Sequence, residues 1–466
     1  MLSTHWYFYL EAMSTQLLTS AGPKVRTSIQ LLETLTERYA GNVSVRFWDD
    51  SSWSSRPDLP ARFILVLRHP GALRQMLWPF SAVAFGEAYI FDDFDIEGDI
   101  FAFTPWLAHL ITLGEQTRLG EKLRLLWRLL QLPRQTNPRD PTWAGRPRSE
   151  AQGIEGDRKG ISFHYDRPSE FFRLFLGPTM QYTCSYFADP EEGLAVSQRR
   201  KMDYICRKLR LQSGERFLDV GCGWGGLLIH AAKHYGVEGV GVTLAAKQAE
   251  WAERAIRNDG LQDRVRIHYC HYRQMPYLAE FDKVSSVGMC EEVGRRNLAT
   301  YFRKIWEALK PGGTYLHHSI TLRPNLPYPR WTAFARKYVF PNGQLHDLPE
   351  ALQFATEAGF EIRDVENLRE HYSLTLKAWV RDLEANRAEA VRLAGDVNYR
   401  IYRVYMAGAT LGFDSGVYHL NQTVMSKPDQ SRAGWPLTRA DWYARPPVVL
   451  PNPDPLWQDA FPLTSS

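Results

Sequence analysis

Residues 217–226 read FLDVGCGWGG, and this stretch indicates the fold class. Three of its glycines, Gly221, Gly223 and Gly226, match the G-x-G-x-x-G pattern of dinucleotide-binding folds. An apolar pair precedes the loop, and residues 227–236 follow it with apolar side chains at helical spacing. A strand, a tight loop and a helix in this order are typical of the nucleotide site of a doubly wound α/β sheet.

The end of the next expected strand distinguishes between two nucleotide cofactors. A nicotinamide site carries an Asp or Glu about 20 residues past the glycines, where it holds the ribose hydroxyls. Here that strand, 237–244, ends in Thr243 and Leu244 without an acid. Asp219 instead precedes the loop in the D-x-G-x-G-x-G arrangement common among S-adenosylmethionine (SAM) methyltransferases. The pattern therefore favours SAM over NAD.

The composition is that of an ordinary globular protein. The chain has 466 residues, which predicts two domains. Hydrophobic residues make up 44% and charged residues 23%, and the formal net charge of +4 does not indicate a nucleic-acid partner. The aromatic content of 13%, with 15 Trp, suggests apolar pockets or a surface that meets a lipid interface.

Cysteine usage and hydropathy bear on the compartment. The five cysteines are scattered without a C-x-x-C pair, which argues against a disulfide framework or a zinc site and fits a reducing cytoplasm. The first 18 residues lack a basic start and are broken by Glu11, so they do not predict a signal peptide, and Met13 is an alternative start. No run approaches the roughly 20 apolar residues of a transmembrane helix. We expect a protein that is soluble or lies on a membrane without crossing it.

Residues 1–132 are expected to form a smaller N-terminal α+β domain, with strands at 43–48 and 63–68. The segment 118–132 predicts an amphipathic basic helix. Its apolar residues on one side are Leu119, Leu123, Leu126, Trp127 and Leu130. Such a helix can lie at an anionic lipid surface. Taken alone, the pattern favours the ordinary alternative, a surface helix that packs on its own domain.

The remaining chain divides into three parts. Residues 133–160 carry four prolines and four glycines and predict a linker. Residues 161–430 alternate strand and helix patterns, which predicts an α/β domain with a doubly wound, Rossmann-like methyltransferase sheet. Residues 431–466 are rich in proline and predict an extended tail that wraps the domain or is partly disordered.

Longer stretches resemble a known family over about 161–425. They occur in the family's order and at compatible spacings: ISFHYDRPSEFFRLFLGPTMQYTCSYF (161–187), FLDVGCGWGGLLIHAAKHYG (217–236), GVTLAAKQ (241–248), SVGMCEEVG (286–294), YLHHSI (315–320), KYVFPNG (337–343) and HYSLTLKAW (371–379). The chain resembles the cyclopropane-fatty-acid synthases, a SAM-dependent family that includes the mycolic acid cyclopropane synthases. Residues 43–132 are similar, through looser motifs, to the N-terminal region of longer members.

The resemblance implies a set of SAM-binding residues: Tyr182, Thr183, Asp219, Gly221, Gly223, Gly225, Thr243, Leu244, Gln248 and Tyr272. Tyr272 is favoured over His271 as a neighbour of the adenine, because relatives often have an acid where His271 stands. Without the resemblance, Tyr182 and Tyr272 would be ordinary half-buried tyrosines.

The resemblance also implies a reaction, the addition of a one-carbon unit to a cis double bond of an acyl chain. A carbocation formed on the chain must then lose a proton, so the site needs a water-poor cavity, a positioned base and electron-rich aromatic faces. Family members use a bound bicarbonate as the base. The residues implied to surround it, here called the anion cage, are Glu291, His318, Ile320, Tyr372 and, through its backbone, Cys184. Singly, each has an ordinary structural interpretation, such as a carboxylate at a helix start for Glu291.

Two departures from the family pattern stand out. Glu292 follows the cage glutamate where relatives commonly have His, and Ala409 stands where some relatives have a cysteine. Neither removes a cage residue.

Three alternatives to a cyclopropane product remain at this point. They are a methylene- or methyl-branched product from the same methyl transfer, a small-molecule amine methyltransferase, and a non-catalytic lipid-binding protein. The resemblance implies an unsaturated phospholipid substrate, an N-terminal domain that presents the lipid, and a cytoplasmic enzyme in peripheral contact with an anionic membrane. A homodimer is left open.

Overall fold

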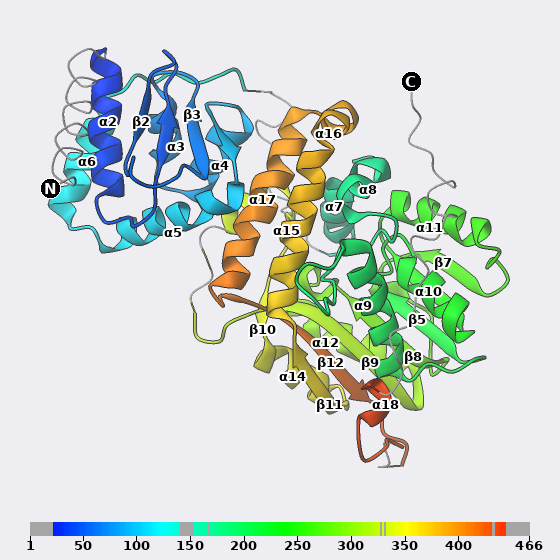
Figure 1. Ribbon diagram of the computed structural model, residues 1–466. Helices are drawn as coiled ribbons and strands as arrows, with labels where there is room; N and C mark the ends of the chain where they lie inside the picture. Colours follow the sequence, from blue (N-terminus) through cyan, green and yellow to red (C-terminus); the bar gives the residue numbers. More distant parts are fainter. Residues whose placement is uncertain are drawn as a thin grey trace, which may run out of the picture. The chain divides into compact units, whose positions relative to one another are not determined.

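The computed structural model describes residues 22–139, 153–165, 167–326, 329, 332–430 and 434–443. The chain divides into two compact units (Figure 1). The N-terminal unit comprises Met1–Arg146 with Arg330–Phe334, and the C-terminal unit comprises Pro147–Pro329 with Ala335–Ser466. The expectations about Met13 and a signal peptide lie outside the described residues. No helix in the described part is long and apolar enough to cross a membrane.

The N-terminal unit combines helices with a small mixed sheet, as its sequence predicts. Its elements are α2 (Pro23–Thr36), β1 (Ser44–Arg46), β2 (Ser52–Ser54), β3 (Phe63–Leu67), α3 (Ala72–Leu77), α4 (Ala82–Ile90), β4 (Phe94–Gly98), α5 (Ile100–Gln116) and α6 (Leu119–Gln131). The strands lie in the order β2-β1-β3-β4. The two strands expected at 43–48 and 63–68 are confirmed as β1 and β3.

Helix α6 turns a different side toward the core than its apolar pattern suggests. Leu125 and Leu129 are buried at 7% and 1% exposure, and the helix packs against α2 and α3. Most of the apolar row expected on one side instead faces outward, with exposures of 73% for Leu119, 57% for Leu123, 65% for Trp127 and 49% for Leu130. The helix therefore has two apolar faces, and only one of them is used within its own unit.

The C-terminal unit contains an eight-stranded sheet flanked by helices. Its elements are α7 (Ile154–Tyr165), α8 (Ser169–Leu176), α9 (Leu194–Leu209), β5 (Arg216–Val220), α10 (Gly226–Tyr235), β6 (Glu238–Thr243), α11 (Ala246–Asn258), β7 (Val265–Tyr269), η1 (Tyr272–Gln274), β8 (Phe281–Val287), η2 (Cys290–Glu292), η3 (Arg295–Asn297), α12 (Leu298–Ala308), β9 (Leu309–Leu322), β10 (His346–Asp347), α14 (Leu348–Glu357), β11 (Glu361–Asn367), α15 (Arg369–Ala385), α16 (Arg387–Ala394), α17 (Asp396–Asp414), β12 (Tyr418–Ser426) and α18 (Ala440–Tyr443). Helix α13 (Thr332–Tyr338) contains the boundary between the two units.

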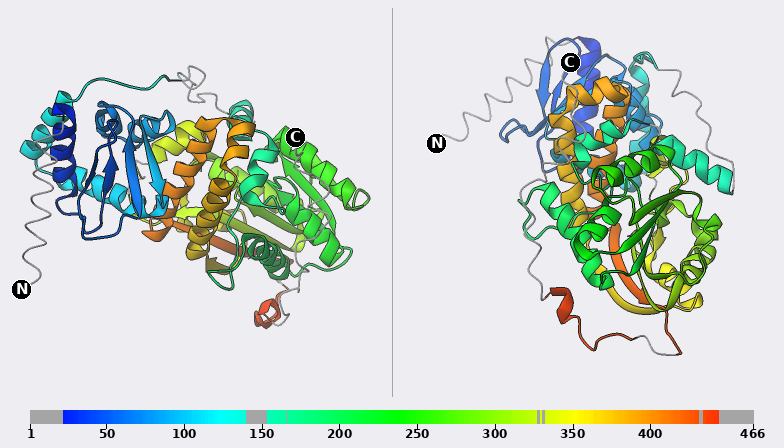
Figure 2. Two further views of the ribbon diagram at one scale, coloured as in Figure 1. Left: turned by 45° about the horizontal axis from the view of Figure 1, so that its top comes forward. Right: turned by 90° about the vertical axis from the view of Figure 1, so that its right-hand side faces the viewer.

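The sheet is doubly wound, as predicted. Its strands lie in the order β11-β12-β9-β8-β5-β6-β7, with β10 pairing β9. Strands β9 to β7 are parallel, while β12 runs antiparallel to both of its neighbours. One apolar cluster packs α12 and α14 on the sheet, and a second packs α9, α10 and α11. Helices therefore cover both faces, as Figure 2 shows.

The sequence order β5–loop–α10 places the glycine loop at the carboxyl end of a central strand. In an open α/β sheet, ligands bind at this edge, where the strand order reverses. Here β6 and β8 flank β5 on opposite sides. The long helices α15 and α17 lie side by side in this unit, and α15 carries Tyr372.

Two expected boundaries differ from the structure. Helix α7 begins at Ile154, inside the segment 133–160 that the sequence indicates as a linker. Gly156 and Gly160 of this helix are buried. Because glycine has no side chain, these two residues allow close packing of the helix, although in the sequence they suggest a linker. Of the expected tail 431–466, the described residues 434–443 contain α18, whose Trp442 is fully buried against α9. The rest of the tail lies outside the described residues.

Candidate active site

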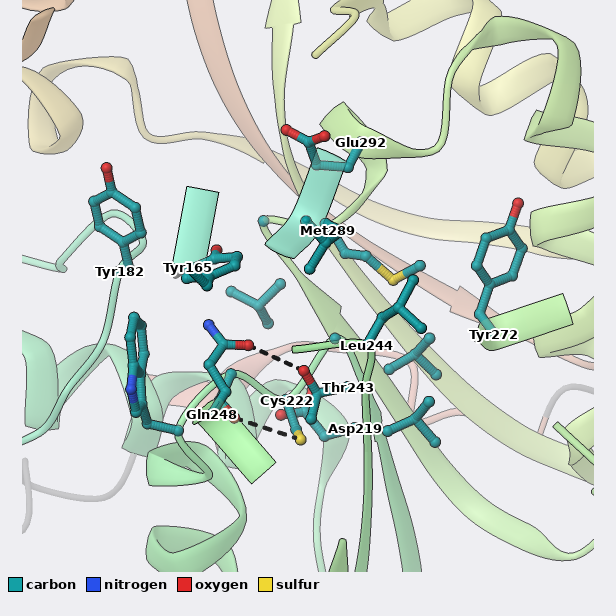
Figure 3. Close-up of a pocket in the computed structure, with 18 of the residues that line it drawn as sticks. Tyr165, Tyr182, Asp219, Cys222, Thr243, Leu244, Gln248, Tyr272, Met289 and Glu292 are labelled. Carbon is teal, nitrogen blue, oxygen red and sulfur yellow. Dashed lines mark hydrogen bonds between the residues drawn. The ribbon is translucent and has the colours of Figure 1, made fainter. Parts of the chain in front are cut away.

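A pocket opens at the carboxyl ends of β5, β6 and β8 in the C-terminal unit. Nine residues expected to bind SAM line it: Tyr182, Thr183, Asp219, Gly221, Gly223, Thr243, Leu244, Gln248 and Tyr272. In Figure 3, Tyr165 and Tyr182 lie on one side, Tyr272 lies on the other, and Thr243 and Leu244 lie between them. The structure therefore brings together residues from segments that are far apart in the sequence.

Gly221 shapes the loop at the base of the pocket. Its φ of 85° lies in the left-handed region, and a Cβ at this position would come within 2.9 Å of the Met289 Cβ. Gly223 lines the pocket as well. Gly225 does not line it. It precedes α10, where a Cβ would lie 3.0 Å from the Ala252 Cβ, so its role is to let two helices approach.

The loop acid Asp219 is buried and lines the pocket. The Ser285 hydroxyl donates a hydrogen bond of 2.6 Å to its Oδ1. Burial raises the pKa of Asp219 to about 6, opposed by this hydrogen bond and by the charge of Lys201. Asp219 therefore links the glycine loop to the neighbouring strand β8.

Residues at the ends of β6 and β7 supply the polar groups on another side of the pocket. The Thr243 hydroxyl donates to Gln248 Oε1 at 3.0 Å, and this pair follows β6. Both His271 and Tyr272 line the pocket. His271 accepts the Arg273 N–H at Nδ1, so its Nε2 donates to Asp157 on α7 at 3.0 Å. His271 is therefore held by α7, while the buried Tyr272 hydroxyl has no partner among the described residues.

Lys201 on α9 is a site residue that the sequence analysis missed. Its side chain is fully buried, and its Nζ donates to Gln181 Oε1 at 2.8 Å and to Thr183 Oγ1 at 2.7 Å. Because an ammonium only donates, the Thr183 hydroxyl proton is left to point elsewhere. Burial lowers the pKa of Lys201 to about 7, opposed by Cys184 and Asp219. Lys201 thus holds the side chains of Gln181 and Thr183, which lie in the segment that leads from the pocket to Cys184.

A second group of polar atoms lies next to the pocket. The Ile320 N–H donates to Glu291 Oε1 at 2.6 Å, whereas the buried Glu291 Oε2 has no partner among the described residues. The Nε2 of His318, on the same strand β9, is also buried without a described partner. Neither Glu291 nor His318 lines the pocket, and their two free atoms remain available to a polar ligand, since buried polar groups are nearly always hydrogen-bonded.

Burial controls the charge of this group. It raises the pKa of Glu291 to about 7, opposed by the Ile320 N–H. It lowers the pKa of His318 well below its ordinary value, assisted by the charges of Lys201, Lys208 and His317. At neutral pH the histidine is therefore neutral, and the glutamate can gain or lose a proton.

Tyr372 and Cys184 face the same region. Burial raises the pKa of Tyr372, and Tyr405, Cys184 and Glu291 are the neighbours that add most to this shift. Burial also raises the pKa of the Cys184 thiol, whose Sγ contacts the carbonyls of Ser185 and Leu368. A protonated, buried thiol is not a nucleophile. All five cysteines are free.

Glu292 lies in the pocket, where relatives commonly have His. Burial, together with the negative charges of Glu291 and Asp157, raises its pKa to about 8. This carboxyl is therefore largely protonated at neutral pH, so the pocket does not gain a full negative charge from the substitution.

A cluster of aromatic rings packs around Tyr182, which lines the pocket. His164 contacts both Phe340 and Tyr182, with ring centroids 4.2 and 5.5 Å away, and the Phe340 and Tyr182 rings lie 6.5 Å from each other. Tyr182 also packs against Trp379, at 5.2 Å. Faces of this kind are apolar, and their π-electrons can stabilise a nearby cation. The pocket and its surroundings thus combine an adenosyl-type site with an apolar, aromatic compartment.

The family model for mycolic acid cyclopropane synthetase matches residues 154–423. The chain belongs to this family. The match begins at the first residue of α7, the first helix described in the C-terminal unit. The chain is accordingly a SAM-dependent methyltransferase of the mycolic acid cyclopropane synthetase family.

Individual members of the family and related structures agree with this assignment. The chain is 35% identical to a probable fatty acid methyltransferase of Pseudomonas putida, over 86% of this chain and 95% of the relative. It is 33% identical to cyclopropane mycolic acid synthase 1 of Mycobacterium tuberculosis, over 57% of this chain and 96% of the relative. The solved structure of the synthase CmaA1 complexed with SAH and CTAB matches 57% of this chain and 97% of its own, with 32% identity and a TM-score of 0.55.

Proposed function

We propose that this family member transfers the methyl group of SAM to the cis double bond of an unsaturated phospholipid acyl chain and closes a cyclopropane. The observation that carries the proposal is the pair of buried, unpartnered polar atoms, Glu291 Oε2 and His318 Nε2, beside the cofactor pocket. An amine substrate, which brings its own lone pair, would not need them. The names of the two relatives, which refer to fatty acids and mycolic acids, support an acyl substrate.

The pocket residues hold SAM, which supplies an electrophilic methyl group to the weakly nucleophilic alkene. Thr183, fixed by Lys201, directs its hydroxyl proton away from the ammonium, where it can meet a carboxylate of the ligand. The glycine loop allows the backbone to approach the methionine part. Tyr182, Tyr165 and their aromatic neighbours exclude water, which would otherwise trap a carbocation on the lipid chain.

The cage residues fit a bicarbonate, which when bound accepts the proton that the methylated chain must lose. Glu291 and His318 would hold it, since their free atoms offer one acceptor and one hydrogen-bonding ring nitrogen. Ionised Glu291 accepts a hydrogen bond from the hydroxyl of such an anion, and the Ile320 N–H keeps the carboxylate in place. Tyr372, buried on α15 with Glu291 among its electrostatic neighbours, would complete the cage.

A branched product is the second candidate. The relative that shares 95% of its length with this chain is named a probable fatty acid methyltransferase, not a cyclopropane synthase. A 1,2-hydride shift moves the positive charge onto the methylated carbon, and loss of a proton from the new methyl group then leaves a methylene branch. The cage residues serve either outcome, because both require a base next to the cation.

A competition assay tests the substrate class. SAM with a labelled methyl group is incubated with vesicles of monounsaturated phospholipid and an equimolar soluble tertiary amine. We expect the label in the lipid fraction and none in the amine. Label found only in the amine would exclude the lipid substrate.

We further propose that the N-terminal unit presents the lipid. The match to the Pseudomonas putida protein covers 403 residues, more than the C-terminal unit holds, so it extends into the N-terminal unit. The outward row of α6, Leu119, Leu123, Trp127 and Leu130, is flanked by exposed Lys122 and Arg124 on its two sides. Apolar side chains between cations are typical of a helix that lies in an anionic membrane surface.

Leu123→Asp is expected to weaken binding to vesicles that contain phosphatidylglycerol by about thirtyfold, because it removes an inserted side chain and adds a repelled charge, each worth roughly 1 kcal/mol. SAM affinity should not change. Sedimentation with vesicles measures the effect. Leu437→Asp, at a fully exposed leucine of the C-terminal unit, is the matched control. Equal losses in both variants would argue against α6 as the membrane contact.

A further inference from the structure

A row of polar residues crosses the sheet beside the anion cage. Glu366 on β11 lies opposite Gln422 on β12, and Gln422 lies opposite His318 on β9. Lys208 of α9 lies against this row, where its Nζ forms an ion pair with Glu366 and donates to Gln422 Oε1 at 2.9 Å. The side chains of Lys208 and Gln422 are fully buried. These residues therefore form one continuous hydrogen-bond network that ends at His318.

The donor and acceptor properties of these groups determine which atom donates in each hydrogen bond of the network. The adjacent Glu366 carboxylate opposes the lowering of the Lys208 pKa by burial and keeps the lysine a donor. The Gln422 atom that faces Lys208 must therefore be the amide oxygen. The amide nitrogen then faces His318 Nδ1, at 3.1 Å. Because an amide NH2 only donates, Nδ1 must accept, and the single proton of the neutral ring resides on Nε2.

The Nε2 of His318 is the atom that the cage uses. It is buried and has no partner among the described residues. His318 and Ile320 are two residues apart on β9, so their side chains point to the same face of the sheet. With the proton on Nε2, this face offers a hydrogen-bond donor; with the proton on Nδ1, it would offer a lone pair, which repels an anion.

We propose that Lys208 and Gln422 are positioning residues that hold His318 in its neutral Nε2–H form, so that the anion cage receives a donor. The consequence for turnover rests on the proposed function of the cage. The tautomer itself does not depend on that function, and it can be measured separately.

Gln422→Glu is the sharpest test, because the carboxylate has nearly the same shape but can only accept. It should still pair with Lys208, and it should draw the His318 proton to Nδ1. ¹⁵N NMR of protein labelled at histidine, assigned by comparison with His318→Asn, reports the protonation of both ring nitrogens. We expect an unprotonated Nδ1 in the natural protein and a protonated Nδ1 in the variant. A protonated Nδ1 in the natural protein, or identical spectra of the two proteins, would overturn the proposal.

Turnover gives the second readout. Gln422→Glu is expected to lower kcat by about tenfold or more with little change in the KM for SAM, since the cofactor pocket is untouched. Lys208→Met, which frees the Gln422 amide to rotate, should lower kcat in the same direction and yield a mixture of both tautomers. Thr423→Val is the control, because the Thr423 hydroxyl is buried without a described partner one residue away; it should leave both readouts unchanged.

The two readouts separate the two claims. An altered tautomer with unaltered turnover would contradict the proposed role of His318 in the cage while the positioning role stands. If Gln422→Glu fails to bind SAM in calorimetry, its structure is disturbed, and Lys208→Met is used as the test variant instead. A single unprotonated-Nδ1 form in that variant would overturn the proposal.

Discussion

Glu291→Gln is expected to lower turnover by about tenfold or more, equivalent to roughly 1.4 kcal/mol of lost transition-state stabilisation, and to leave SAM affinity nearly intact. The amide oxygen can still accept the Ile320 N–H, so the local structure should persist. In place of the free Oε2, however, the variant presents an NH2 group, which cannot accept a proton. Near-normal turnover would remove Glu291 from the mechanism.

The pH profile identifies the cause of that loss. Because the pKa of Glu291 is raised to about 7, the carboxyl is protonated below this pH and becomes an acceptor above it. With the bicarbonate concentration held constant, kcat of the natural enzyme should therefore rise as the pH increases through about 7. The Gln variant should lack this limb. Glu370→Gln is the matched control and should keep this rise of kcat with pH. Glu370 lies two residues from Tyr372 in the sequence, and its own side chain is 69% accessible.

Gly221→Ala is expected to weaken SAM binding by about tenfold or more, measured by calorimetry. A Cβ at this position meets the Met289 Cβ at 2.9 Å and also requires a left-handed φ of 85°. The methionine, which lines the pocket itself, must then shift, and the shift changes the shape of the pocket. Left-handed backbone alone costs a non-glycine residue about 1–2 kcal/mol.

Gly214→Ala separates strain from pocket geometry. Gly214 has nearly the same φ, 84°, but no atom lies within 4 Å of the added Cβ. Both variants should lose similar stability from backbone strain, whereas SAM affinity should fall only in Gly221→Ala. If both variants bind SAM equally, the loop contact does not shape the cofactor site.

The glycine loop was predictable because its determinants are local. A strand, a loop that needs left-handed backbone and an apolar helical pattern occupy one continuous stretch, and this stretch together with the alternation of strand and helix patterns predicts the doubly wound sheet. The start of α7 was not predictable in the same way. Gly156 and Gly160 are linker-like in isolation, and only packing in the folded unit makes them helix residues.

The orientation of α6 shows a second limit. Spacing reveals that apolar residues share a side, but α6 carries two such sides, and the sequence does not state which one meets the core. Leu125 and Leu129 do so, which leaves Leu123 and Trp127 outside.

Lys201 and Gln422 mark a third limit. A lysine within a helix usually indicates a solvated face, and a glutamine in a strand carries no signal of its own. Their roles arise from cross-strand register and from burial, which only the folded structure supplies.

The central claim is that this enzyme methylates an alkene within a lipid. The most direct measurement is ¹³C NMR of monounsaturated phospholipid vesicles after incubation with the enzyme and SAM labelled in its methyl carbon. We predict that the label appears as the high-field methylene carbon of a cyclopropane ring within the acyl chain, with loss of the alkene signals. Acyl chains that remain unlabelled, with the alkene intact, under conditions where the enzyme binds both SAM and the vesicles would contradict the account.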